Sequence, residues 1–152
     1  MTIRASLEKD ARAFLTRAPL AFSNDSYTAL EAALQRLIDW SVAHAPDVQW
    51  APSDGSDAKV GVSAGPARLM VWRVFPRKDD GGKVTLMPGS GRDIADAVRR
   101  ETVNVLNTLR PDDPIKPGSA LEVDLHAIAS DAQWHLFEPA LQLALDTSRG
   151  SS

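Results

Sequence analysis

The sequence has no cysteine among its 152 residues, and this absence excludes several kinds of site. Without thiols the chain has no disulfide framework, no zinc–thiolate centre and no cysteine nucleophile. It also has no apolar run approaching the roughly 18 residues of a membrane span. The N-terminus, MTIRASLEKDARAFL, is charged and lacks the continuous apolar core of a signal peptide. We therefore expect a soluble, cytoplasmic protein.

The net charge is also small, with a formal value of only -3 at pH 7. This small negative value argues against a globally basic nucleic-acid-binding protein. The charge is unevenly distributed, however. Residues 68–110 contain nine Lys and Arg against five Asp and Glu, whereas the remaining residues contain eight against fifteen. This asymmetry hints at a molecule with one basic face, although small proteins also acquire it by chance. No pattern indicates a cofactor.

Apolar residues recur at helical spacing in four segments. The segments are residues 7–17, 26–44, 92–109 and a last helix that begins after Ser130. Ser6 is the expected N-cap of the first helix, and Ser130 with Gln133 forms the expected capping box of the last. Pro139 is expected to bend the last helix.

Period-two alternation predicts five strands, around residues 48–50, 60–62, 68–76, 84–87 and 121–127. The third strand is apolar on both sides, which predicts a central position with both faces covered, and Arg73 within it needs a partner. The order ααββββαβα predicts a single compact α+β domain over residues 1–147, followed by a disordered tail at 148–152. Its mainly antiparallel or mixed sheet of four or five strands packs against helices.

Basic residues collect on the hairpin VWRVFPRKDDGGKVTLMP, residues 71–88, and on the helix that follows it. Basic side chains beside glycine can bind phosphates, because the backbone approaches closely there. The alternative is that they protect a sheet edge from pairing, and Asp79 and Asp80 in the turn would partly cancel the attraction. The loop MPGSGRD also suggests an anion site, but it lacks the Lys-Ser/Thr of a P-loop, and Ser90 explains it equally well as an N-cap. The candidate anion-binding residues are Arg73, Arg77, Lys78, Lys83, Arg92, Arg99 and Arg100.

Two carboxylate patterns are candidates for a metal site. Glu122, Asp124 and His126 would share one face of a strand, although a solvated strand face explains them too. Asp47, with Asp57 and Lys59, has the letters of the PD-(D/E)xK nucleases, in which carboxylates hold a divalent metal. That alternative makes the protein a metal-dependent hydrolase.

Four tryptophans are numerous for this length. Most are expected in the core, but a solvent-facing one among Trp40, Trp50, Trp72 and Trp134 could anchor a partner. A dimeric scaffold is therefore a further alternative.

Four segments resemble, in their order and pattern, small uncharacterised bacterial α+β domains. These segments are TALEAALQRLIDW, AKVGVSA, RVFPRKDDGGKVTL and LHAIASDAQWHLFEPALQLAL, and the resemblance spans about two thirds of the chain. Some members of that group occur beside or fused to nuclease-type proteins and are suspected of binding DNA. The first helix and residues 92–109 with their proline loop look like insertions relative to them. The resemblance implies at most a binding domain without catalytic residues. The basic residues of the hairpin and the helix after it would make nucleic acid or an acidic protein its partner.

Overall fold

The computed structural model describes residues 2–17, 24–52, 59–75, 82–87, 96–116 and 119–150. Its elements follow the predicted order ααββββαβα, so the predicted α+β class is confirmed. The helices are α1 (Ile3–Arg17), α2 (Asn24–Ala43), α3 (Asp96–Asn107) and α4 (Asp131–Gly150), with a short 3-10 helix η3 (Leu125–Ile128). The strands are β1 (Val48–Trp50), β2 (Val60–Ala64), β3 (Leu69–Phe75), β4 (Lys83–Leu86) and β5 (Glu122–Asp124).

The five strands form one antiparallel sheet in the order β1-β2-β3-β4-β5. Strand β3 occupies the middle of the sheet, as its apolar sequence predicts. The pairing of β2 with β3 shifts register between Val62 and Ser63, at a β-bulge. Each strand pairs with its sequence neighbour, which is the topology that short connections favour.

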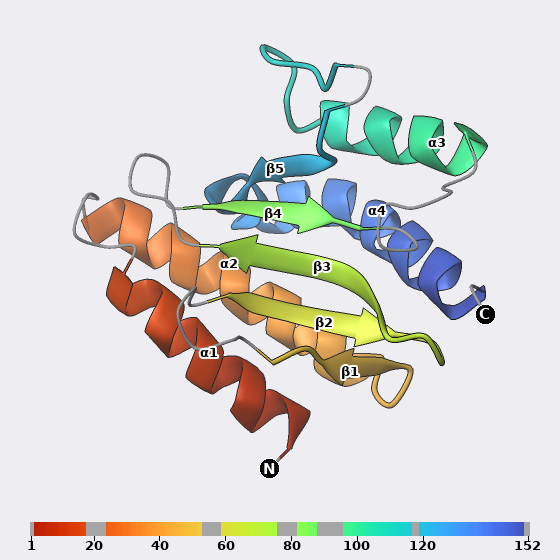
Figure 1. The fold of residues 1–152 in the computed structure, drawn as a ribbon. Helices are drawn as coiled ribbons and strands as arrows, with labels where there is room; N and C mark the ends of the chain where they lie inside the picture. The colour runs from red at the N-terminus through yellow and green to blue at the C-terminus, as the bar shows by residue number, and fades with distance from the viewer. Residues whose placement is uncertain are drawn as a thin grey trace.

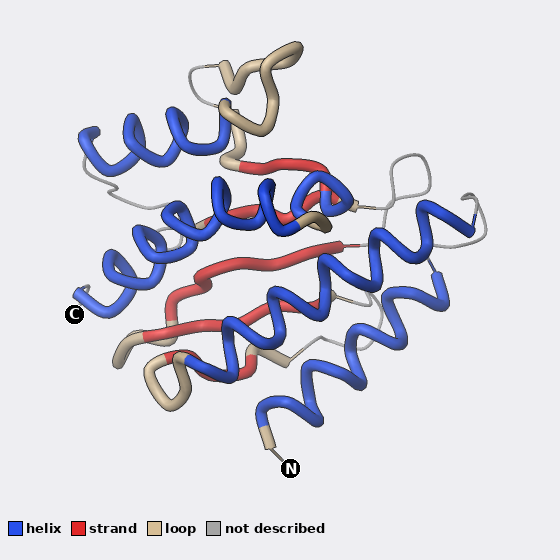
Figure 2. Tube along the Cα trace, turned by 180° about the vertical axis from the view of Figure 1, so that it is seen from behind, coloured by secondary structure: helices blue, strands red, loops and turns tan. Residues whose placement is uncertain are grey.

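The helices are distributed unequally over the two faces of the sheet. Helices α1, α2 and α4 all lie on one face, and α3 packs against α4 beyond the β5 edge (Figures 1 and 2). No described helix lies over the other face, which is turned toward the viewer in Figure 1 and is called the front face below. Among the described residues, helices cover β3 on one side, and Val71, Trp72 and Val74 of this strand are fully buried.

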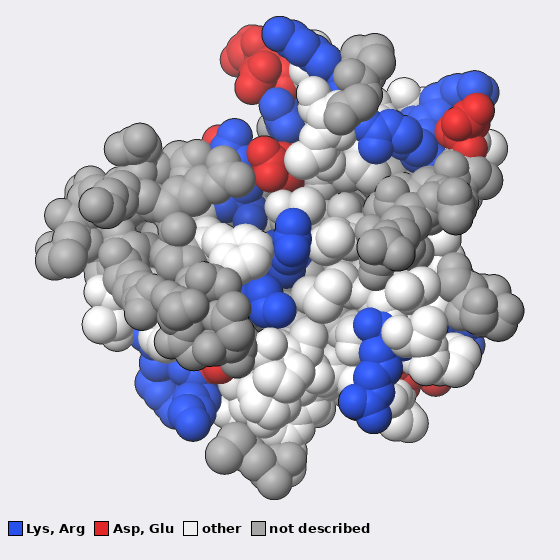
Figure 3. Space-filling model, viewed as in Figure 1, with Lys and Arg blue, Asp and Glu red and all other residues white. Residues whose placement is uncertain are grey.

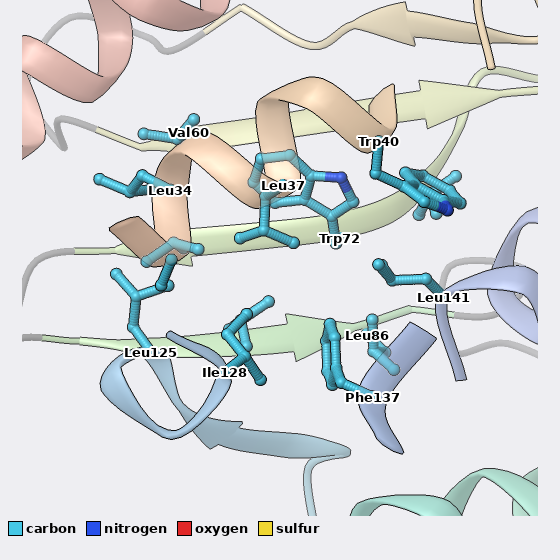
Figure 4. Close-up of a cluster of buried hydrophobic side chains, with 14 of the residues drawn as sticks. Leu34, Leu37, Trp40, Val60, Trp72, Leu86, Leu125, Ile128, Phe137 and Leu141 are labelled. Atoms are coloured by element: carbon cyan, nitrogen blue, oxygen red, sulfur yellow. The ribbon is translucent and has the colours of Figure 1, made fainter. Parts of the chain in front are cut away.

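The core lies between the sheet and this single helical layer. Trp72 of β3 is completely buried there, and its indole Nε1 donates a hydrogen bond to Ser41 Oγ of α2 at 3.1 Å. Ser41 Oγ in turn donates to the carbonyl oxygen of Leu37 at 2.8 Å. The surrounding side chains come from α2, the sheet, η3 and α4 (Figure 4); they include Leu34, Leu37, Val60, Leu86, Leu125, Ile128, Phe137 and Leu141.

Both chain ends differ from the sequence prediction. Helix α1 begins before Ser6: the backbone N–H of Ala5 donates to Thr2 Oγ1 at 3.1 Å, so Thr2 caps the helix and Ser6 is buried within it. At the other end, we expected the chain to leave the fold at residue 148. Helix α4 instead runs to Gly150, and Ser148 is fully buried.

The predicted strand at 121–127 is shorter than expected. Strand β5 ends at Asp124, and the next four residues form η3, in which Leu125 and Ile128 both enter the core. Helix α3 is described from Asp96 to Asn107, and residues 88–95, where its predicted start falls, lie outside the described residues. Within the described part of the chain no helix combines the length and apolar character that a membrane span requires.

The predicted cap of the last helix is confirmed. The backbone N–H of Gln133 donates to Ser130 Oγ at 3.3 Å, and Ser130 Oγ donates to Gln133 Oε1 at 2.9 Å. We expect Ser130→Ala to lower the free energy of unfolding by about 1 kcal/mol, because a helix N–H loses its acceptor. Urea denaturation measures this change. Ser119→Ala is the control, since Ser119 is an exposed loop residue; an equal loss in both variants would contradict the capping role.

Candidate nucleic-acid interface

The register of the sheet places a row of side chains across the front face. Gly61, Arg73, Thr85 and Glu122 are successive partners on β2, β3, β4 and β5. Side chains alternate along a strand, and Trp72 faces the helices, so its neighbour Arg73 and the rest of this row face the front. A second row on the same face, two residues further along each strand, contains Phe75, Lys83 and Asp124.

Arg73 lies in the middle of this face, and its guanidinium is held against an aromatic ring. The guanidinium carbon is 5.1 Å from the centroid of the Phe75 ring, within the range of a cation–π contact. Gly61 leaves room for this arrangement, because a Cβ there would lie 3.2 Å from Arg73 Cβ. Among the residues that the structure describes, the buried Nε of Arg73 has no hydrogen-bond partner. The described partner of Arg73 is therefore the Phe75 ring.

Lys83 is the second predicted basic residue on this face. It is directly opposite Asp124 on β5, and its Nζ lies 3.8 Å from Asp124 Oδ1. In the adjacent row, Thr85 Oγ1 donates to Glu122 Oε2 at 3.3 Å. The front face is thus basic over β3 and β4 and acidic over β5. Figure 3 shows basic side chains near the middle of this face with acidic ones beside them.

The other predicted basic residues do not join this group. Arg99 and Arg100 belong to α3, which packs against α4, and they line a separate hollow. Arg77, Lys78 and Arg92 lie outside the described residues, so whether the hairpin tip binds an anion stays a prediction. The seven candidates therefore include at least two groups on different elements.

The metal candidates are placed as follows. Glu122 and Asp124 share the front face, but His126 belongs to η3 and is exposed, so the alternation that would have aligned it with them ends at Asp124. Among the described residues no group of three or more His, Asp or Glu side chains could hold a metal ion. Asp47 is near Arg149, with 3.6 Å between Asp47 Oδ2 and Arg149 Nη1, and Asp57 lies outside the described residues.

The tryptophans divide as expected between core and surface. Trp40, Trp72 and Trp134 are buried, whereas Trp50 is 38% exposed and donates from Nε1 to Asp10 Oδ2 at 2.9 Å. Trp50 lies on the edge strand β1, and this hydrogen bond connects its side chain to Asp10 of α1. A partner bound there stays a prediction.

Two contributors to these surfaces were not predicted from the sequence. Phe75 could have been found, because residues two apart on a strand share a face and Phe75 lies two residues after Arg73. Lys116, in the proline-rich loop, lies beside Arg99 and Arg100 only because the loop returns to α3, and no local signal predicts that. No family model, curated protein or solved structure matches this chain. The resemblance to the bacterial α+β domains thus stays a prediction.

Proposed function

We propose that this protein is a non-catalytic binding domain that takes single-stranded nucleic acid on its front face. The observation that carries the proposal is Arg73, held over the Phe75 ring in the middle of a sheet face over which no described helix lies; among the described residues its Nε has no hydrogen-bond partner. Aromatic rings and guanidinium planes can stack on any of the bases, because every base has a flat aromatic face. Arg73 supplies charge for a phosphate between those bases, whereas Lys83 is near Asp124.

The shape of the face favours a single strand over a duplex. A duplex is entered through its major groove by a helix or a two-stranded ribbon, whereas a sheet face offers a broad surface. Bases that are already unpaired can lie on such a surface without the cost of opening a duplex. The acidic side chains of β5 limit the path of the strand, because Glu122 and Asp124 repel phosphate. We therefore place the nucleic acid over β3 and β4, since every residue of β2 is buried.

The charge of the face sets the expected salt dependence. Lys83 is already near Asp124, so Arg73 is the front-face cation counted here, and one neutralised phosphate contributes a slope of about −0.7 to the logarithmic salt dependence for single strands. The affinity should then fall about 2.6-fold between 50 and 200 mM salt. An acidic protein partner would show a similar salt effect but would not depend on ring stacking by Phe75.

Fluorescence anisotropy with labelled mixed-sequence single-stranded and duplex DNA tests this function. We expect saturable binding that is stronger for the single strand, and a loss of about fivefold or more with Phe75→Leu or Arg73→Gln. The matched control is Arg12→Gln, which removes the same charge from an exposed position on α1, in the helical layer. Equal losses in Arg12→Gln and Arg73→Gln would reduce the effect to net charge, and no binding at 50 mM salt would refute the proposal.

A further inference from the structure

A hollow of about 300 Å³ lies between α3 and the loop that follows it. Its floor is apolar, formed by half-buried Val103 and buried Ile115. Its remaining lining is charged and comes from both sides of the hollow: Asp96, Arg99, Arg100 and Lys116. This volume reaches the lower end of the range in which proteins bind small molecules.

The hollow retains unbalanced positive charge. It has three cations against one carboxylate, and within the described residues none of the three makes an ion pair. A second hollow, of about 200 Å³ beside β5, differs in this respect. There Lys83 is near Asp124 at 3.8 Å, and Arg110 pairs with Asp113 at 3.0 Å. The described lining of the β5 hollow thus has two cations against the three carboxylates of Asp112, Asp113 and Asp124, whereas that of the α3 hollow keeps a surplus of two positive charges.

The walls of the α3 hollow are held in place by hydrogen bonds. Arg99 Nη2 donates to the carbonyl oxygen of Ser119 at 2.7 Å, which fixes the guanidinium. The backbone N–H of Ile115 donates to Asn107 Oδ1 at 2.9 Å and ties the loop to the end of α3. Arg110 Nη1 donates to the carbonyl oxygen of Glu122 at 2.7 Å, which anchors the start of the loop to β5. Walls that are already fixed lose less entropy when a ligand binds.

We infer that the α3 hollow binds a phosphate monoester. At pH 7 such a group carries a charge of about −1.5 to −2, which matches the surplus in the hollow. The planar forks of Arg99 and Arg100 suit phosphate oxygens, and Lys116 adds a point charge. The apolar floor takes the organic body that carries the phosphate. That body is either a small molecule or the 5′ end of a nucleic-acid strand, and only the second source rests on the proposed function.

Isothermal titration calorimetry of the full chain with phenyl phosphate tests the site directly. We expect saturable binding that weakens about tenfold in Arg100→Gln and in Lys116→Gln, since each removes a charged donor. Both side chains are exposed, so these variants should fold. Arg12→Gln is the control for net charge and should bind phenyl phosphate like the unmodified protein. Phenyl sulfate, a monoanion of similar shape, should bind more weakly.

Oligonucleotides with a 5′-phosphate or a 5′-hydroxyl distinguish the two sources. Tighter binding of the phosphorylated strand, lost in Arg100→Gln, assigns the site to strand ends. Equal binding of the two strands, together with phenyl phosphate binding, assigns it to a small phosphate monoester. Absence of saturable phenyl phosphate binding by the folded protein would overturn the inference, as would binding that Arg100→Gln and Lys116→Gln leave unchanged. Neither result depends on whether the front face binds DNA.

Discussion

Replacing Trp72 by alanine is expected to lower the free energy of unfolding by about 3–5 kcal/mol. The indole is completely buried between β3 and the helical layer, so its removal leaves a cavity that the surrounding leucines fill only in part. It also removes the hydrogen bond from Nε1 to Ser41 Oγ. Urea denaturation followed by far-UV circular dichroism measures the loss without relying on tryptophan fluorescence.

Trp50→Ala provides the matched control for this measurement. Trp50 has the same side chain, but it is 38% exposed on the edge strand β1, where its indole donates a hydrogen bond to Asp10. We expect it to cost about 1 kcal/mol. If the two alanine variants lost the same stability, close packing around Trp72 would not be what holds β3 to the helices.

The position of Trp72 also separates stability from binding. Its neighbour Arg73 points to the opposite face of the same strand, away from the helical core. Arg73→Gln removes a charge and a ring contact from that face but leaves the core side chains in place. Binding changes in Arg73→Gln should therefore occur without a large loss of stability, and Trp72 variants are unsuitable for testing the front face.

The helices and their order could be predicted because local periodicity and tertiary packing agree there. In α2 the apolar residues at helical spacing do face the core, where Leu30, Ala33, Leu34 and Leu37 are buried and Val42 is partly buried. At Ser130 the capping prediction needed only residues three apart in the chain, and such local interactions are visible in a sequence.

Where local signals were ambiguous, tertiary packing decided the structure. Leu121, Val123 and Leu125 alternate as a strand would, yet Ile128 is also buried, and its three-residue separation from Leu125 suits one turn of a 3-10 helix. A strand continuing past Asp124 would not have brought both Leu125 and Ile128 to the core. Ser6 has the letters of an N-cap, but Thr2 takes that role because the helix extends further toward the N-terminus.

The candidate sites depend on non-local geometry, which composition does not contain. The sequence predicts which side chains are basic, but strand register alone brings Arg73 beside Phe75 and Lys83 opposite Asp124. The α3 hollow likewise exists because a loop returns Lys116 to the helix that carries Arg99. The described basic residues of segment 68–110 therefore include a group on the strands of the front face and a group on α3. Different variants test the two groups.

A second large loss of stability is expected when Gly65, in the turn between β2 and β3, is replaced. Its φ of 78° lies in the left-handed region, where a residue with a side chain loses about 1–2 kcal/mol. A Cβ at this position would also lie 2.4 Å from the carbonyl oxygen of Ser148, so the end of α4 would have to move. We expect Gly65→Ala to lower the free energy of unfolding by roughly 2–4 kcal/mol, the sum of strain and displacement.

Arg68 offers the matched control, because it occupies the same turn with a φ of 52° and is not a glycine. In Arg68→Gly, relief of backbone strain stabilises the folded state, whereas the greater conformational freedom of glycine stabilises the unfolded chain. Because the two effects oppose each other, we expect the free energy of unfolding to change by no more than about 1 kcal/mol. Urea denaturation compares the two variants, and amide hydrogen exchange should show faster opening near Ser148 in Gly65→Ala only. If both variants exchanged alike there, the contact between the β2–β3 turn and α4 would not be what holds the end of that helix against the sheet.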